Sequence, residues 1–82
     1  MGRRSRQKPR RLAGKLRRMR TSRRLSQDGL ISYIGLQGQI RRQDISDFER
    51  GKREPSLAIL LAYAQAAGVT VEILIDDKRN LP

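Results

Sequence analysis

The chain has 82 residues, with 19 lysines and arginines against 8 acids, a formal net charge of +11, and neither cysteine nor histidine. A chain of this length forms one small domain, and it lacks the side chains of a disulfide or of a zinc site with nitrogen or sulfur ligands. No apolar run approaches the ~20 residues that span a bilayer, and no signal-peptide hydrophobic region follows the basic N-terminus. We expect a cytoplasmic protein without metal, cofactor or membrane association.

The positive charge is concentrated at the start of the chain. Residues 1–24 contain twelve basic residues and no acid, whereas residues 25–82 are close to neutral. Such a distribution favours a polyanion as partner. Residues 1–11 show no apolar periodicity, so we expect a flexible basic arm there. Its cationic residues are Arg3, Arg4, Arg6, Lys8, Arg10 and Arg11.

Helical periodicity begins at Leu12. Apolar residues three and four positions apart lie on one face of a helix, and the first such set is Leu12, Leu16 and Met19. Ser26 is a good N-cap for a second helix. The buried face of this second helix is expected to consist of Leu30, Ile31 and Ile34. Gly35 and Gly38 follow and mark its end.

A third helix is predicted at about residues 41–50. Ile45 and Phe48, three positions apart, mark its buried side. If Arg41 is the N-cap, Ile40 and Ile45 occupy the two positions of a hydrophobic staple, which would anchor the start of the helix to the core.

Two more helices are predicted after Gly51. Pro55 followed by Ser56 starts a fourth helix, whose buried face is expected to consist of Leu57, Leu60, Leu61 and Ala64. Gly68 ends it. A short fifth helix follows Thr70 and carries Val71, Leu74 and Ile75. No strand is predicted, so the expected fold is all-α, a compact domain of five helices.

In this order and spacing, the segments resemble the XRE/Cro/phage-repressor family of helix-turn-helix proteins. The resemblance covers residues 12–76 and rests on Leu25-Ser26-Gln27, on Ile34-Gly35-Leu36 and on the run from Ile45 to Ser56. It implies a DNA-binding domain at 12–76, between the basic arm (1–11) and a C-terminal tail (77–82).

The chain departs from the family pattern at several positions. Between Leu36 and Ile45 it has eight residues, Gln37 to Asp44, where the family usually has four, so the turn before the third helix carries a four-residue insertion. Three single positions also differ from the residue types usual in the family: Arg24 replaces a glycine, Gly29 a capping acid and Ile31 a small residue. These departures bear on the angle of the third helix.

The resemblance implies that the third helix lies in the major groove with its N-terminal residues at the base edges. The implied base-reading residues are Arg42, Gln43, Ser46 and Asp47. Arginine suits guanine and glutamine suits adenine, whereas aspartate accepts from cytosine. The alternatives are a solvated helix face for Arg42 and Gln43, and neutralisation by a nearby arginine for Asp47. The implied phosphate contacts are Gln27, Arg41, Arg50, Lys52 and Arg53, and Arg20 with Glu49 is the implied structural ion pair.

The expected function is that of a sequence-specific regulator of transcription bound to double-stranded DNA and associated with the nucleoid. Repression is preferred, because a chain of this size leaves no room for an activation domain. Two alternatives remain open: an antitoxin-type autorepressor, whose partner is a toxin, and a coactivator-like adaptor of the transcription machinery. An enzyme is poorly supported, since no histidine, cysteine or glycine-rich phosphate loop is present. Few aromatic residues are available to stack single-stranded bases.

We also expect a weak homodimer that DNA strengthens. One recognition helix reads only about four or five base pairs, and such proteins generally bind pseudo-palindromes as two-fold dimers. The segment Val71–Leu81 holds more apolar residues than a one-turn helix buries, so Ile73 or Ile75, with Leu81, is expected at the interface. The alternative is that all of them cover the core of the monomer.

Overall fold

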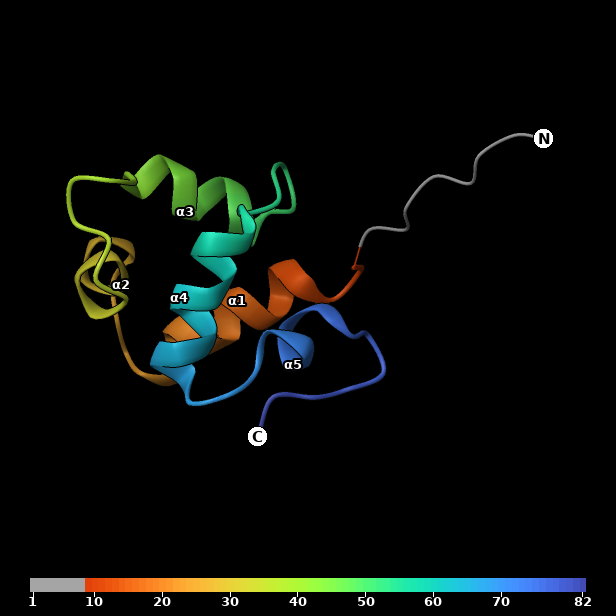
Figure 1. The fold of residues 1–82 in the computed structure, drawn as a ribbon. Helices are drawn as coiled ribbons and strands as arrows, with labels where there is room; N and C mark the ends of the chain where they lie inside the picture. The colour runs from red at the N-terminus through yellow and green to blue at the C-terminus, as the bar shows by residue number, and fades with distance from the viewer. Residues whose placement is uncertain (1–8) are drawn as a thin grey trace.

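The computed structural model describes residues 9–82, which form five α-helices and no strand. The helices are α1 (Leu12–Ser22), α2 (Gln27–Tyr33), α3 (Arg42–Glu49), α4 (Leu57–Ala67) and α5 (Val71–Ile75). α1 contacts α3 and α5, α2 contacts α3, and α4 contacts α5 (Figure 1). The predicted all-α fold with five helices is confirmed. No helix within this part of the chain is long and apolar enough to cross a membrane.

Serine caps set the starts of two helices. The hydroxyl oxygens of Ser26 and Ser56 each accept a hydrogen bond from the backbone N–H three residues further on, at 2.9 and 3.3 Å. These bonds satisfy donors that have no partner inside the helix. Gly68 ends α4 with a φ of +71°, where a side chain would be strained. Thr70 precedes α5 in the N-cap position, but its side chain makes no capping bond.

The core draws on all five helices. Its buried apolar residues are Leu12, Leu16, Met19, Leu30, Ile31, Ile34, Ile45, Phe48, Leu60, Tyr63, Ala64 and Leu74. The faces predicted for α1, α2 and α3 are therefore confirmed. The face predicted for α4 is partly wrong, because Leu57 and Leu61 are 73% and 47% exposed, whereas Tyr63 is fully buried. α4 is apolar on nearly every side, so spacing alone does not identify its buried face.

The segment that follows α5 folds back onto the start of α1 (Figure 1). The ammonium of Lys15, a buried residue of α1, donates to the carbonyl oxygens of Ile73 and Asp76, both at 2.7 Å. Burial lowers the pKa of Lys15. These bonds satisfy carbonyl groups at the C-terminal end of α5, where helices leave acceptors without partners.

A carboxylate of the C-terminal segment also holds the backbone before α1. The two Asp77 oxygens accept from the backbone N–H groups of Arg10 and Arg11, at 2.9 and 3.0 Å. The Arg11 guanidinium in turn donates to the Asp77 carbonyl, at 2.9 Å, and to the Asn80 side chain, at 2.6 Å. We call this arrangement the Asp77 clasp. Of the predicted arm, Arg10 and Arg11 belong to the clasp, and its other cationic residues lie outside the described residues: Arg3, Arg4, Arg6 and Lys8.

Candidate DNA-binding surface

α3 rests on the core and presents polar side chains outward. Ile45 and Phe48 are buried beneath it. Arg41 is the N-cap, and the Asp44 carboxylate accepts from its backbone N–H at 2.8 Å. An arginine side chain has no acceptor, so only this half of a capping box is possible. Ile40, directly before the cap, is half-buried against the core, as the staple prediction requires. The start of α3 is thus capped by its own Asp44 and is anchored to the core by Ile40 and Ile45.

The orientation of α3 relative to α1 is set by a two-point ion pair. Arg20 Nε donates to Glu49 Oε2 at 2.7 Å, and a second guanidinium nitrogen donates to Oε1 at 2.9 Å. The third nitrogen donates to the Leu25 carbonyl at 2.9 Å. The Glu49 side chain is only 4% exposed, and the hydrogen bond to it raises the pKa of Arg20. Charge-assisted bonds of this geometry add direction as well as energy.

The predicted base-reading residues occupy the first two turns of α3. Arg42 and Gln43 are exposed, and Ser46 and Asp47 are half-buried. The Gln43 amide donates to Asp47 at 3.0 Å. Arg42 lies 3.7 Å from Asp28 of α2, with both side chains about two-thirds exposed. Surface pairs of this kind contribute at most about 1 kcal/mol, so a stronger polyanionic partner can replace them.

The predicted phosphate contacts lie on both sides of these residues. Gln27 is the first residue of α2, and Arg41, Arg50, Lys52 and Arg53 are all exposed. Arg50 pairs with Asp47 at 3.5 Å.

Arg53 is held more firmly than its neighbours. Its guanidinium lies 3.1 Å from an Asp44 oxygen and 5.3 Å from the centre of the Phe48 ring. The side chains of Arg41 and Lys52, by contrast, form no ion pair with any residue from 9 to 82. Their charges remain available to an anionic partner.

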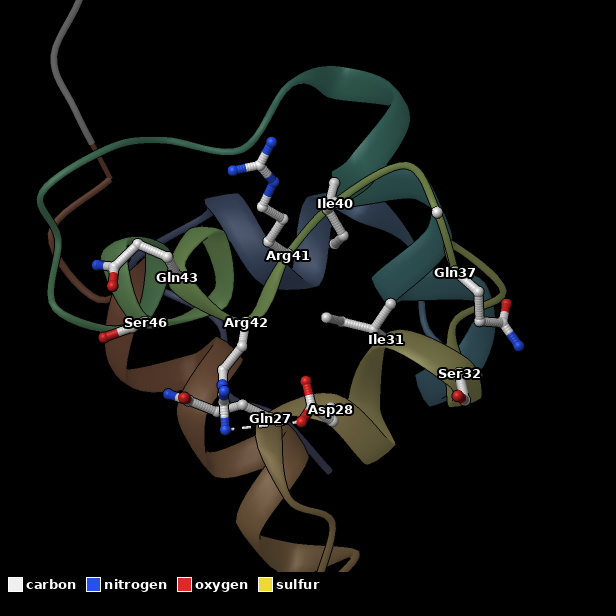
Figure 2. A pocket seen from close by; sticks show the side chains of 11 residues that line it. Gln27, Asp28, Ile31, Ser32, Gln37, Ile40, Arg41, Arg42, Gln43 and Ser46 are labelled. Atoms are coloured by element: carbon white, nitrogen blue, oxygen red, sulfur yellow. Dashed lines mark ion pairs between the residues drawn. The ribbon is translucent and has the colours of Figure 1, made fainter.

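An open hollow of about 640 Å³ lies between α2, the turn after it and the start of α3. Figure 2 shows the side chains that line it. Five of the predicted DNA contacts line it: Gln27, Arg41, Arg42, Gln43 and Ser46. Ser32 and Gln37 stand on the opposite side of the hollow from Gln43 and Ser46 (Figure 2). Arg50 and Lys52 do not line it and follow the C-terminal end of α3. The fold therefore gathers residues of α2, α3 and the turn between them on one polar surface.

A family model described as a helix-turn-helix matches residues 16–74. The chain belongs to this helix-turn-helix family, of the XRE type. No curated protein and no solved structure matches it significantly. Membership makes the chain a DNA-binding regulator of transcription, with double-stranded DNA as its partner.

Two acids of this surface were not among the predicted site residues. Asp44 caps α3 and holds Arg53, and its position three residues after the N-cap is a signal that the sequence offers. Asp28 pairs with Arg42 across the gap between two helices. That contact depends on how α2 and α3 pack, and no local pattern indicates it.

Proposed function

We propose that the protein represses transcription by binding specific sites in double-stranded DNA, with α3 in the major groove. The observation that carries this proposal is the position of Arg42 and Gln43, exposed in the first turn of a helix whose opposite face is buried. Those two side chains have the donors and acceptors that recognise guanine and adenine. A protein seated in the groove at a promoter excludes polymerase from the same base pairs.

Asp47 and Ser46 complete the proposed base-reading set. In the unbound protein the Asp47 carboxylate holds the Gln43 amide and lies near Arg50. On DNA, we propose, the Gln43 amide exchanges Asp47 for an adenine edge. Asp47 then has an acceptor available for the cytosine amino group. The Ser46 hydroxyl can bond with either a donor or an acceptor on a base edge.

The proposed phosphate contacts flank this set. Gln27 is the first residue of α2, and Arg41 is the N-cap of α3. Arg50, Lys52 and Arg53 follow the last turn of α3. Each phosphate neutralised by a cation releases counterions, so affinity falls with salt in proportion to the number of such contacts. The basic residues before Pro9 add charge for the same strand or for an A·T-rich minor groove.

We further propose a two-fold dimer on DNA, through a patch formed by Leu57, Leu61 and Ile75. These residues are 73%, 47% and 39% exposed, and Leu57 and Ile75 line one shared hollow. Leu81, expected at the interface, is instead half-buried against the core. Ile73 is half-buried as well.

A binding assay at ~150 mM salt with an operator selected from random DNA tests base reading. Arg42→Ala or Gln43→Ala is expected to cost about 1–3 kcal/mol on the operator and to relax preference at one or two base pairs. Lys52→Ala is the matched control, because it should weaken all sequences alike and reduce the salt slope by about one. Equal losses on operator and random DNA for Arg42→Ala would contradict the placement of α3.

Transcription in vitro from a promoter that carries the operator tests repression. The protein is expected to lower transcript yield, and Arg42→Ala is expected to restore it at the same protein concentration. Stimulation of transcription by the unchanged protein would contradict a repressor.

A further inference from the structure

The turn that carries the four-residue insertion runs from Gln37 to the N-cap of α3, and its first four residues, Gln37 to Ile40, which we call the insertion, lie in the middle of the proposed DNA-binding surface. One hollow beside it is lined by Gln27, Arg42 and Gln43 together with Gln37 and Gly38. A second hollow, on its other side, joins Gly38, Gln39 and Ile40 to a set of α3 and α3–α4 residues: Arg41, Gln43, Asp44, Asp47 and Arg53. A duplex that reaches the proposed contacts on both sides therefore passes over the insertion.

The insertion is an ordered turn. The N–H groups of Gln39 and Ile40 donate to the Leu36 carbonyl at 3.0 and 3.3 Å. Gly38 has a φ of +80°, a conformation that glycine adopts without strain. Ile40 is half-buried against the core, so the return of the chain to α3 is anchored. This turn leaves Gln37, Gly38 and Gln39 exposed.

The chemistry of these exposed residues suits a DNA backbone. Gln37 and Gln39 carry amide donors, the insertion contains no acid, and Gly38 allows close approach of main-chain atoms. Half to two-thirds of protein–DNA hydrogen bonds go to phosphate and sugar oxygens, from side chains such as these. Gln27, a proposed phosphate contact, lines the same hollow as Gln37 (Figure 2).

We propose that the insertion is a second DNA-contacting element, in which Gln37 donates to phosphates in the hollow between α2 and the insertion, and Gln39 donates to phosphates in the second hollow, beside α3 and Arg53. This inference rests on the proposed function and extends it. The insertion gives one wall of the first hollow, and Gln27 lines the same hollow. Because glutamine is uncharged, its contacts add affinity without releasing counterions.

The test is the double variant Gln37→Ala/Gln39→Ala, which keeps Gly38 and the anchored Ile40. Loss of two hydrogen bonds is expected to weaken binding about five- to 150-fold, to the selected operator and to random duplex alike. The salt slope is expected to stay unchanged, in contrast to Lys52→Ala. Hydroxyl-radical cleavage is expected to reveal loss of protection at the phosphates that the insertion covers. The thermal midpoint is expected to stay the same.

Gln65→Ala is the matched control, because Gln65 is an exposed glutamine of α4 that lines neither hollow. Its affinity should equal that of the unchanged protein. Unaltered affinity of the double variant would overturn the inference alone, and so would a loss confined to the operator, which indicates base contact. Absence of duplex binding by the unchanged protein would overturn the proposed function and the inference together.

Discussion

Arg24 adopts a backbone conformation that favours glycine. Its φ is +58° in the connection between α1 and α2, at the position where the family usually has glycine. A left-handed conformation costs a residue with a Cβ about 1–2 kcal/mol. Arg24→Gly removes this strain but makes the unfolded chain more flexible, so we expect a net stabilisation of about 0.5–1 kcal/mol, measured by urea unfolding. Arg23, with a φ of −99°, is the control. Arg23→Gly should destabilise, and a loss of stability in Arg24→Gly would contradict the strain.

The Asp77 clasp makes a second prediction, on pH. The backbone N–H groups of Arg10 and Arg11 hold the pKa of Asp77 below its ordinary value of 3.8. Because the folded-state pKa is lowered, the clasp stabilises the fold above the ordinary value, and its contribution is lost as the pH falls through the lower folded-state pKa. Asp77→Asn is therefore expected to lower the thermal midpoint at neutral pH, and the difference from the unchanged protein should disappear in strong acid.

The control for this titration is Glu72→Gln, which removes an exposed carboxylate on α5. It should leave the thermal midpoint at neutral pH almost unaltered. The difference in thermal midpoint between Asp77→Asn and the unchanged protein could also persist undiminished well below the ordinary pKa of aspartate. That result would rule out the clasp as its source.

At the scale of the helix, the ion pair between Arg20 and Glu49 connects α1 to α3 with little exposure of either side chain. Glu49→Gln leaves the Arg20 charge without its counter-charge, and we expect a loss of about 3–5 kcal/mol in the free energy of unfolding. The free energy of unfolding of Tyr63→Phe, a change at another buried residue, serves as the comparison. The Tyr63 hydroxyl is buried without a hydrogen-bond partner among the described residues, and burial raises its pKa.

Removing that hydroxyl should leave stability unchanged or raise it slightly, because its desolvation is not offset by a hydrogen bond. Denaturant unfolding of both variants gives the comparison. A loss below about 1 kcal/mol for Glu49→Gln would show that the pair contributes orientation without stability.

The elements that the sequence predicted well are those with one clear apolar face or a local cap. The sets ending in Met19, Ile34 and Phe48 are spaced three and four apart, and the structure buries all of them. The buried face predicted for α4 was partly wrong because apolar residues surround this helix, and the side that packs inward depends on neighbouring elements. Lys15 lies in register with Leu12 and Met19 on α1, a signal for its burial that its charge obscured.

The contacts that pattern alone missed connect distant parts of the chain. The Asp77 clasp joins residues 66 and 67 positions apart, and no local rule indicates such a pairing. The insertion was evident as extra length, but its place between two hollows depends on how α2 and α3 pack. The candidate site was predicted through the family resemblance, residue by residue. The ion pairs of Asp28 with Arg42 and of Asp44 with Arg53 required the structure.

For the molecule as a whole, the clasp divides the basic arm, residues 1–11, into two parts. Arg10 and Arg11 belong to the clasp, and residues 1–8 precede it. Deletion of residues 1–8 keeps the clasp and removes four cations, so affinity for DNA is expected to fall ten-fold or more at low salt while the thermal midpoint stays the same. Deletion of residues 1–11 also removes Arg11 and its bonds to Asp77 and Asn80. That longer deletion should lower the midpoint as well. Equal DNA affinity of the full chain and of the chain without residues 1–8 would contradict a contact between these residues and DNA.

The last prediction concerns assembly on DNA. One copy of α3 reaches only about four or five base pairs, so selective binding favours two copies on a pseudo-palindrome. The exposed patch of Leu57, Leu61 and Ile75 is small, so dimerisation without DNA should be weak.

Light scattering is expected to show monomers in the absence of DNA and a 2:1 complex on a symmetric operator duplex. Leu57→Asp and Ile75→Asp should convert that complex to 1:1, whereas Gln65→Asp, on an exposed part of α4, should not. A 1:1 complex of the unchanged protein on a symmetric site would exclude the dimer, and a 2:1 complex in all three variants would place its interface elsewhere.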